Sequence, residues 1–495
     1  MLDYVISKTQ EYLDGMPKTK RKKIGQFFTS RETARFMAGL FSVPKKEHLD
    51  ILDPGTGSAI LTAALMERLQ QESSVKSVSL ICYETEPAIL DLLKDNLEYI
   101  KSIVRFDLDY TIITDNYITS QQLPLAFADF VIGNPPYLKV NRLAEEAQAM
   151  SHVVYGAPNL YFLFASRSIE NLRDKGELVY IIPRSWTSGA YFKAFRNFLF
   201  KKTTIEHIHL FISRDKVFEQ EAVLQETMII KLKKEIGTAN EIVISSTETN
   251  NDFNNIQEIT VPKKLVIGND DNQYVYLVTN KEEVNVLERL SVFHNTLPSL
   301  DMKMKTGLTV DFREREHLMD EPTNDNVPMF FAQHLKDGRI TFPIGKHGEY
   351  IDTRKSGLLQ DNTNYLFVKR FTSKEESRRL QSSIYLQDDF PTYKQISTQN
   401  KLNFITRNKK SLTKQMVYGL YCLFNSTLYD KYYRILNGST QVNSTEVNTM
   451  PMPTLEGIVY LGQRLMASND LTEKTCDRIL EEYLDDEIRR SEKVS

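Results

Sequence analysis

The sequence contains few cysteines and no long apolar run, and each of these absences excludes a class of protein. Three cysteines occur in 495 residues, at Cys82, Cys422 and Cys476. They lie far apart and form no metal-spaced pair, so neither a metal site nor a disulfide framework is expected, and a reducing cytoplasm fits. No apolar run is long enough to cross a bilayer, and the N-terminus lacks a signal-peptide pattern. The sequence therefore predicts a cytoplasmic protein without a membrane partner.

The chain also has little net charge. Its 62 basic and 65 acidic side chains leave a formal charge of −3. A nucleic-acid partner would therefore have to be held by local basic patches, because the global charge gives no attraction. A length of 495 residues predicts two domains, and the 41% apolar content is typical of a globular protein.

A glycine loop follows the first predicted strand. Residues 48–53 read as a strand, the sequence Pro-Gly-Thr-Gly-Ser follows, and residues 59–69 form an apolar helix. This order is typical of a nucleotide-binding βαβ unit, but the full dinucleotide fingerprint is missing and Asp53 would repel a pyrophosphate. S-adenosylmethionine carries an ammonium and a sulfonium, so it fits Asp53, Gly55 and Gly57 better.

Two further strands also end in polar residues. The strand at 78–83 leads into Glu84, which is placed to accept hydrogen bonds from both ribose hydroxyls. The next strand ends in Asp115 and Asn116, and Asp115 could accept from an adenine amine. An isolated acidic residue at a strand end is by default only an exposed charge. Ligands of open α/β sheets bind at this edge, however, so these residues are candidates for the cofactor site.

A rigid turn follows the buried strand at 128–133. It consists of Asn134, Pro135, Pro136 and Tyr137. Because proline restricts itself and the residue before it, the Asn134 oxygen and a backbone carbonyl can point at one spot and accept both hydrogens of an NH2 group. Tyr137 offers a face for a planar ring, which indicates a nucleobase or, less often, an amide. The alternative is an ordinary proline turn closing an αβ unit.

In chain order, Gly-Gln-Phe-Phe-Thr at 25–29, Asp-Pro-Gly-Thr-Gly at 53–57, Glu84, Asp115 and Asn-Pro-Pro-Tyr at 134–137 resemble the gamma group of DNA adenine-N6 methyltransferases from restriction–modification systems. The resemblance extends to about residue 235. It implies an α/β fold, with a class I (Rossmann-like) methyltransferase domain at 1–235 that binds S-adenosylmethionine. It also implies a mixed target-recognition domain at 236–495. Ser30 replaces a proline common in the family and Ala59 replaces a glycine, and neither change removes a polar contact.

The resemblance also implies roles for individual residues. Thr29 and Asn116 join the cofactor site, and the target base is flipped out and held by the 134–137 turn. Phe218 would be the second aromatic residue stacking on that base, although an ordinary loop aromatic is the alternative. Transfer would be direct, because the sulfonium of the cofactor is a good leaving group. Consistently, no Pro-Cys pair supplies the thiol nucleophile used on cytosine carbon.

Basic stretches could bind DNA in two parts of the chain. Residues 18–23 form a basic arm, which is either solvated or in contact with phosphates. The later stretches at 313–317, 369–379 and 401–414 read as solvated faces or as DNA contacts. The predicted DNA-binding residues are Arg370, Arg378, Arg379, Arg407, Lys409 and Lys410.

The sequence thus predicts a monomeric, site-specific enzyme that methylates adenine N6 in double-stranded DNA and protects it from a cognate restriction endonuclease acting separately. An RNA adenine methyltransferase and a protein glutamine methyltransferase are the alternatives, although the latter would not need a long basic C-terminal half. A catalytically inactive DNA-binding module is the third reading. It would not need Asp53, Glu84, Asp115 and Asn134 together.

His207 and His209 alternate on one strand and are expected to be structural, because no third metal ligand is spaced nearby.

Overall fold

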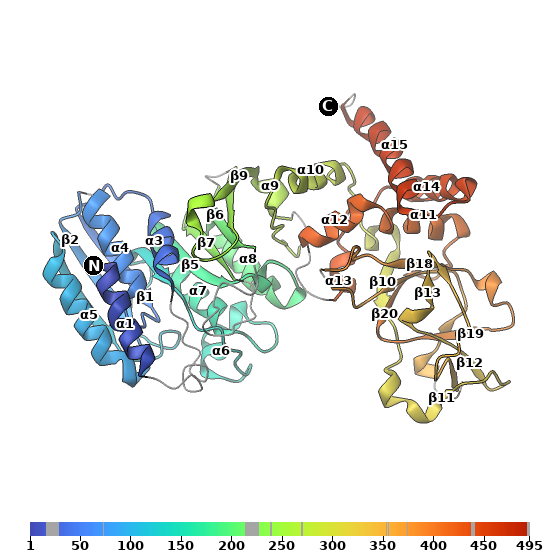
Figure 1. The fold of residues 1–495 in the computed structure, drawn as a ribbon, viewed down its shortest axis with the longest axis horizontal. Coiled ribbons are helices and arrows are strands. Elements are labelled where there is room, and N and C mark those ends of the chain that lie inside the picture. The colour runs from blue at the N-terminus through green and yellow to red at the C-terminus, as the bar shows by residue number, and fades with distance from the viewer. Residues whose placement is uncertain are drawn as a thin grey trace. The chain divides into compact units, whose positions relative to one another are not determined.

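A computed structural model of the chain describes residues 1–15, 29–72, 74–212, 227–237, 240–268, 271–352, 354, 356–373, 375–436 and 441–492. The chain divides into two compact units, Met1–Asn280 and Lys281–Ser495 (Figure 1). The division lies beyond the boundary expected at residue 235. The reason is that two strands after that residue continue the sheet of the first unit.

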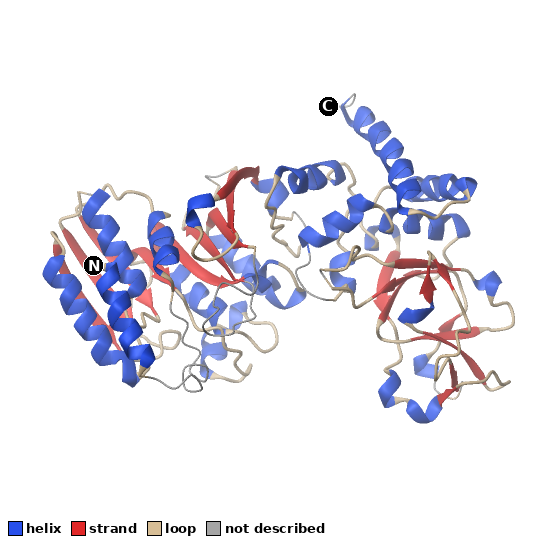
Figure 2. Ribbon diagram, in the orientation of Figure 1, coloured by secondary structure: helices blue, strands red, loops and turns tan. Residues whose placement is uncertain are grey.

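The strands of the first unit, drawn in red in Figure 2, form one sheet with the order β3-β2-β1-β4-β5-β7-β6-β8-β9. Strands β3, β2, β1, β4 and β5 run parallel, whereas β7 is antiparallel to both of its neighbours, β5 and β6. The strands are β1 (His48–Pro54), β2 (Ser77–Tyr83), β3 (Asp107–Ile113), β4 (Ala128–Gly133), β5 (Leu172–Pro183), β6 (Thr204–Phe211), β7 (Thr227–Lys233), β8 (Glu241–Thr247) and β9 (Gln257–Pro262). The predicted α/β class with a parallel sheet is confirmed.

Helices connect and cover these strands. They are α1 (Leu2–Asp14), α3 (Arg31–Gly39), α4 (Ile60–Glu72), α5 (Leu90–Ile103), α6 (Glu145–Ala149), α7 (Leu160–Asn171), α8 (Lys193–Lys202) and α9 (Lys263–Val266). Helix α1 packs against α4 and α5, and its Leu2 and Val5 enter the same apolar core as strand β1. Ser30 caps α3 by accepting the Thr33 N–H. All six residues of β4 are buried, as expected for a strand covered on both faces.

The second unit contains two sheets, with the orders β10-β20-β17-β18-β14-β13 and β11-β15-β12-β19-β16. The strands are β10 (Met302–Thr306), β11 (Leu318–Met319), β12 (Asn326–Phe330), β13 (Leu335–Lys336), β14 (Arg339–Ile340), β15 (Tyr350–Asp352), β16 (Gln360–Asp361), β17 (Tyr365–Lys369), β18 (Ser382–Tyr385), β19 (Gln395–Thr398) and β20 (Leu402–Arg407). The helices are α10 (Lys281–Leu290), α11 (Lys414–Phe424), α12 (Thr427–Leu436), α13 (Ser444–Val447), α14 (Leu455–Ser468) and α15 (Glu473–Glu492). Most of its strand pairs are antiparallel, unlike the parallel strands β1 to β5 of the first unit. Within the described ranges, no helix of either unit has the length and apolarity needed to span a bilayer.

Candidate active site

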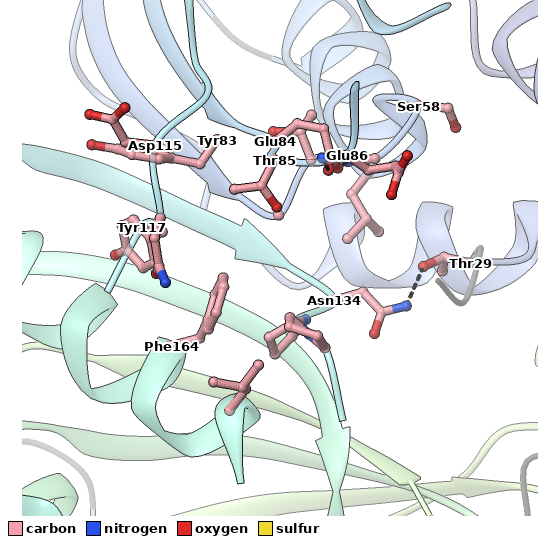
Figure 3. Close-up of a pocket in the computed structure, with 18 of the residues that line it drawn as sticks. Thr29, Ser58, Tyr83, Glu84, Thr85, Glu86, Asp115, Tyr117, Asn134 and Phe164 are labelled. Atoms are coloured by element: carbon pink, nitrogen blue, oxygen red, sulfur yellow. Dashed lines mark hydrogen bonds between the residues drawn. The ribbon is translucent and has the colours of Figure 1, made fainter. Parts of the chain in front are cut away.

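A cavity of about 350 Å³ opens beside the carboxyl ends of β1, β2 and β4 in the first unit (Figure 3). Strand β1 lies between β2 and β4, so this is the point where the strand order reverses and where ligands of such sheets bind. The sequence-predicted residues that line the cavity are Thr29, Gly55, Gly57, Glu84, Asp115, Asn116, Asn134, Pro135 and Pro136. The fold therefore brings together residues spread over more than 100 positions of sequence.

The glycine loop forms one wall of the cavity. Gly55 and Gly57 have φ values of 78° and 59°, which glycine adopts without a steric penalty. The N–H groups of Gly55 and Thr56 both donate to the Tyr83 carbonyl at 2.9 Å, which ties the loop to the end of β2. The loop backbone is thereby held at the cavity wall, where a ligand can approach it closely.

Glu84 has the geometry of a diol acceptor. Its Oε2 accepts the Gly57 N–H at 2.9 Å, and its Oε1 accepts the Glu86 N–H at 2.8 Å. Burial raises the pKa of this carboxyl, while the backbone donors oppose the rise. Each carboxylate oxygen accepts more than one hydrogen bond, so both retain capacity toward the cavity. The free acceptor capacity of Glu84 fits the two ribose hydroxyls of S-adenosylmethionine.

Asp53 lies beneath the loop and does not line the cavity. It is 1% exposed, and its Oδ2 accepts the Thr62 hydroxyl at 2.7 Å. Its Oδ1 is buried without a hydrogen-bond partner among the described residues. Burial raises the pKa of Asp53 to about 7. A cationic group in the cavity would favour the ionised form, so the position suits a cofactor with positive charges.

Asp115 and Asn116, in the loop that follows β3, also line the cavity. Asp115 is exposed and accepts a hydrogen bond from the Gln122 amide. The Asn116 amide donates to Glu146 of α6 at 2.8 Å, and its oxygen accepts the Ile118 N–H at 3.1 Å. Asn116 is thus fixed by protein contacts, whereas Asp115 remains open to a ligand.

The turn after β4 is held by side-chain hydrogen bonds. The Asn134 amide nitrogen donates to the Thr29 hydroxyl at 3.3 Å, and the Asn134 oxygen accepts from the Tyr137 hydroxyl at 2.8 Å. The Tyr137 hydroxyl also lies 3.1 Å from the Ile181 carbonyl. Tyr137 is only 6% exposed and does not line the cavity, unlike the open stacking face that its sequence position suggested. Phe218 and the basic arm at 18–23 lie outside the described residues.

Sequence reasoning missed an aromatic wall. Tyr83, Tyr117 and Phe164 line the cavity, and the Tyr117 ring centroid is 5.0 Å from that of Tyr83 and 5.3 Å from that of Phe164. Tyr83 directly precedes Glu84, so its place could have been inferred. Phe164 lies within an apolar helix, α7, where nothing in the local sequence separates it from a core residue.

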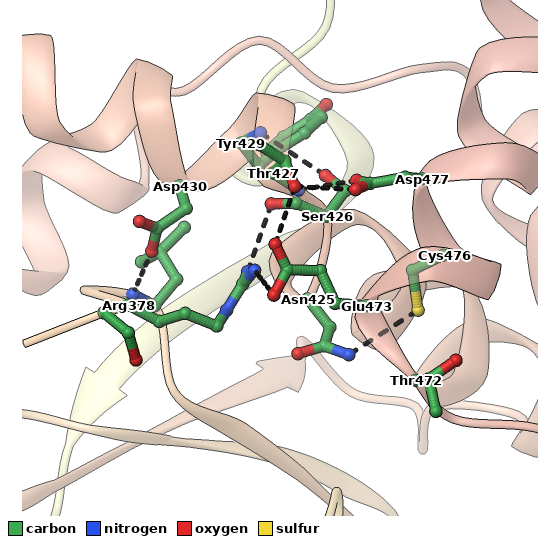
Figure 4. A network of polar contacts seen from close by, with 12 residues as sticks. Arg378, Asn425, Ser426, Thr427, Tyr429, Asp430, Thr472, Glu473, Cys476 and Asp477 are labelled. Carbon is green, nitrogen blue, oxygen red and sulfur yellow. Dashed lines mark hydrogen bonds and ion pairs between the residues drawn. The ribbon is translucent and has the colours of Figure 1, made fainter.

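Two of the six predicted DNA-binding residues are structural here. Arg379 is fully buried, with its guanidinium 5.6 Å from the Tyr433 ring centroid. Arg378 donates to the carbonyls of Phe424 and Ser426 at 3.1 Å each and pairs with Glu473 (Figure 4). These contacts hold α11, α12 and α15 together, which corrects the expectation that both side chains face DNA.

The other four are more accessible. Lys409 and Lys410 are exposed, and Arg407 is partly exposed at 3.8 Å from Asp301. Arg370 is partly exposed, donates to the Asn400 carbonyl at 3.0 Å and lies over the Phe371 ring at 5.5 Å.

The parallel sheet, the glycine loop at its switch point and the buried acceptor at the end of β2 define the class of protein. The first unit is a class I, S-adenosylmethionine-dependent methyltransferase.

Comparison with known proteins agrees and narrows the class. Residues 70–218 match the family model described as Eco57I restriction-modification methylase. The chain is 34% identical over 480 residues to the type II methyltransferase M.BsuBI of Bacillus subtilis, covering 94% of each chain. It is 33% identical over 455 residues to the type II methyltransferase M.PstI of Providencia stuartii, covering 89% of each. The chain belongs to the type II methyltransferases of restriction–modification systems, as its sequence motifs predicted.

Proposed function

We propose that this methyltransferase modifies the N6 amine of adenine at a specific site in double-stranded DNA. The observation that carries the proposal is the position of Asn134 and Pro135 on the wall of the cavity that also contains Glu84 and the glycine loop. An amine held by these two residues would lie beside the cofactor. When bound, S-adenosylmethionine supplies an electrophilic methyl group on a good leaving group.

The turn would act by binding the amine. The lone pair of adenine N6 is delocalised into the ring, so the nitrogen is a poor nucleophile. Acceptance of its two N–H groups by the Asn134 oxygen and the Pro135 carbonyl would favour a pyramidal nitrogen and localise that pair. The Asn134 oxygen already accepts from Tyr137, but it has two lone pairs and can accept a second hydrogen bond. Thr29 holds the other end of the amide, which fixes its orientation.

The amine cannot reach the cavity while its base is stacked in a duplex, so the target adenine would be flipped out. We expect Tyr137 and Phe218 to stack on it. Since Tyr137 is 6% exposed, the ring would have to become accessible when DNA binds. Asn-Pro-Pro-Tyr chemistry also suits a glutamine amide or an adenine in RNA, and membership in a restriction–modification family favours DNA over both.

We propose that the second unit recognises the target sequence. Two exposed phenylalanines there carry a neighbouring arginine over the ring: Phe371, 47% exposed, with Arg370, and Phe312, 62% exposed, with Arg313. Arginine–aromatic pairs suit nucleic acid, because the guanidinium contacts phosphate or base edges and the ring stacks on bases. Together with Lys409, Lys410 and Arg407, these arginines are the side chains that we propose to contact DNA, because a chain of net charge −3 needs local basic groups to attract it.

The biological role would be protection of the cell's own DNA from a cognate restriction endonuclease acting separately, and the enzyme would act as a monomer in the cytoplasm.

Labelled methyl transfer tests the proposal. The full chain is incubated with methyl-labelled S-adenosylmethionine and, in parallel, duplex DNA, RNA and glutamine-containing peptide, and the products are digested and separated. We expect label only in N6-methyladenine from DNA. Label in methylcytosine, in RNA or in peptide would refute the target assignment. Methylation-sensitive sequencing of genomic DNA from cells expressing the chain would then identify the recognition site.

A further inference from the structure

Ser58 of the glycine loop, residues 54–59, is held from two sides by buried polar side chains. Thr9 Oγ1 of helix α1 lies 2.7 Å from the Ser58 hydroxyl oxygen, and the Asn96 amide of α5 donates to the Ser58 carbonyl at 2.9 Å. Thr9, Ser58 and Asn96 are each at most 2% exposed. Ser58 itself lines the cofactor cavity (Figure 3). Two helices distant in sequence thus reach the cofactor loop through hydrogen bonds shielded from water.

The residue that follows Ser58 has an unusual backbone. Ala59 has a φ of 68°, a left-handed conformation that residues with a side chain rarely adopt. It is fully buried, and its carbonyl accepts the Ala63 N–H at 2.8 Å, so it forms the junction between the loop and α4. The glycine that the family commonly has at this position would adopt that φ freely. A strained conformation persists only where neighbouring contacts enforce it, and Thr9 and Asn96 provide such contacts one residue away.

The hydrogen atoms at Thr9 can all be assigned. Thr9 Oγ1 lies 2.7 Å from the Val5 carbonyl as well as 2.7 Å from Ser58 Oγ. The Thr9 hydroxyl has one hydrogen, and the Val5 carbonyl can only accept. The Ser58 hydroxyl therefore supplies the second hydrogen when Thr9 donates to Val5. Loss of the Thr9 hydroxyl would leave the Ser58 hydroxyl without this partner and free to reorient.

We propose that Thr9 is a positioning residue for the cofactor site, which makes helix α1 part of that site. Thr9 does not line the cavity and acts through Ser58, by holding the glycine loop and the strained Ala59 in the shape that receives S-adenosylmethionine. Helix α1 lies outside residues 70–218, which match the family model, and it precedes the glycine loop. The inference concerns cofactor binding, so it holds whichever base is methylated.

Thr9→Val tests the role, because valine keeps the shape of threonine and removes only the hydroxyl. Thr203→Val is the matched control: Thr203 is 2% exposed, its hydroxyl donates to the Leu199 carbonyl at 2.8 Å, and it does not line the cavity. Binding of S-adenosylhomocysteine to the full chain is measured by calorimetry, and the melting temperature of the unliganded protein is measured alongside. We expect Thr9→Val to raise the Kd about 3- to 10-fold, the range of one lost hydrogen bond, and Thr203→Val to change it less than about twofold.

Two further variants show whether Thr9 acts through the loop. In a Ser58→Ala background, Thr9→Val should cost no additional affinity, and Ala59→Gly should recover part of the affinity that Thr9→Val loses. Thr9→Ser, which keeps the hydroxyl, should bind as the wild type does. If Thr9→Val does not fold, Thr9→Cys, with its weakly hydrogen-bonding thiol, takes its place in each comparison. A Kd unchanged in the Thr9 variant while the melting temperature falls as in Thr203→Val, or an equal loss with and without Ser58, would overturn the proposal.

Discussion

The Tyr137 hydroxyl donates a hydrogen bond to the side-chain oxygen of Asn134 over 2.8 Å. The bond joins the first and last residues of the turn after β4, and it orients the oxygen that we propose as an acceptor for the target amine. Tyr137 thus has a contact through its hydroxyl in addition to the stacking that we propose for its ring, and the two can be separated by mutation.

Tyr137→Phe should lower the rate of methyl transfer about 3- to 10-fold, because the Asn134 amide loses one neutral hydrogen bond that orients it. The ring is retained, so binding of the flipped base should change little. Single-turnover transfer and DNA affinity measured on the same variant check this. A rate equal to that of the wild type would mean that the hydrogen bond from Tyr137 is not needed to orient the amide.

Asn134→Ala should abolish methyl transfer while cofactor binding largely survives, since the amide is proposed to hold the target amine and only borders the cofactor cavity. Calorimetry with S-adenosylhomocysteine beside the labelled-methyl assay measures both properties. Substantial remaining activity would refute the proposed mechanism.

Glu84→Ala should weaken cofactor binding by about 10-fold or more, because it removes charge-assisted hydrogen bonds worth roughly 1.5–3 kcal/mol and frees the Gly57 N–H. Glu47→Ala is the control, since Glu47 is an exposed partner of Lys76 on the surface. If both variants bound S-adenosylhomocysteine equally well, Glu84 would not contact the cofactor.

Asp53 predicts a specific pH dependence of stability. Its pKa is raised from 3.8 to about 7 in the folded state, so between these values the folded protein binds more protons than the unfolded chain. The free energy of unfolding therefore falls as the pH rises from about 4 to about 7, by roughly 2–4 kcal/mol from this group.

Asp53→Asn, which cannot ionise, should lack this contribution. We expect the difference in melting temperature between Asp53→Asn and the wild type, both without ligand, to shift in favour of the variant from pH 4.5 to pH 8. A difference that stays constant over this range would show that Asp53 is not held in its protonated form.

The basic residues of the second unit should separate into two groups. Arg379→Ala should destabilise the fold by about 1–3 kcal/mol, because the side chain fills a buried site beside Tyr433.

Lys409→Gln with Lys410→Gln should leave the melting temperature unchanged, weaken DNA binding and flatten its salt dependence. Lys474→Gln, on the acidic helix α15, is the control for loss of an exposed charge. Equal DNA affinity for the lysine pair and the control would remove these lysines from the interface.

The local pattern of the sequence was sufficient for the class of fold and for placing most of the predicted cofactor residues at one cavity. The sequence shows directly the periodicity of the strands, the two glycines of the loop and the polar residues at three strand ends, because each is a pattern of adjacent residues. Parallel strands bring their carboxyl ends to one edge of the sheet. Glu84, Asp115 and Asn134 could therefore be assigned to one site from the sequence alone, and all three line the cavity.

Only the tertiary structure decided which of these side chains are exposed to the cavity and which are buried beside it. Asp53 lies beneath the loop, Tyr137 packs inward, and Arg379 is enclosed by helices, although each has the residue type of a binding group. Phe164 and Thr9 reach the site from helices whose own sequences give no sign of it. The end of the first unit at Asn280 likewise follows from β8 and β9 joining its sheet. Turns and strand periodicity depend on adjacent residues, so the sequence by itself determined the helices, strands and loops. The burial of a side chain depends on residues distant along the chain, so only the tertiary structure decided which side chains face the cavity.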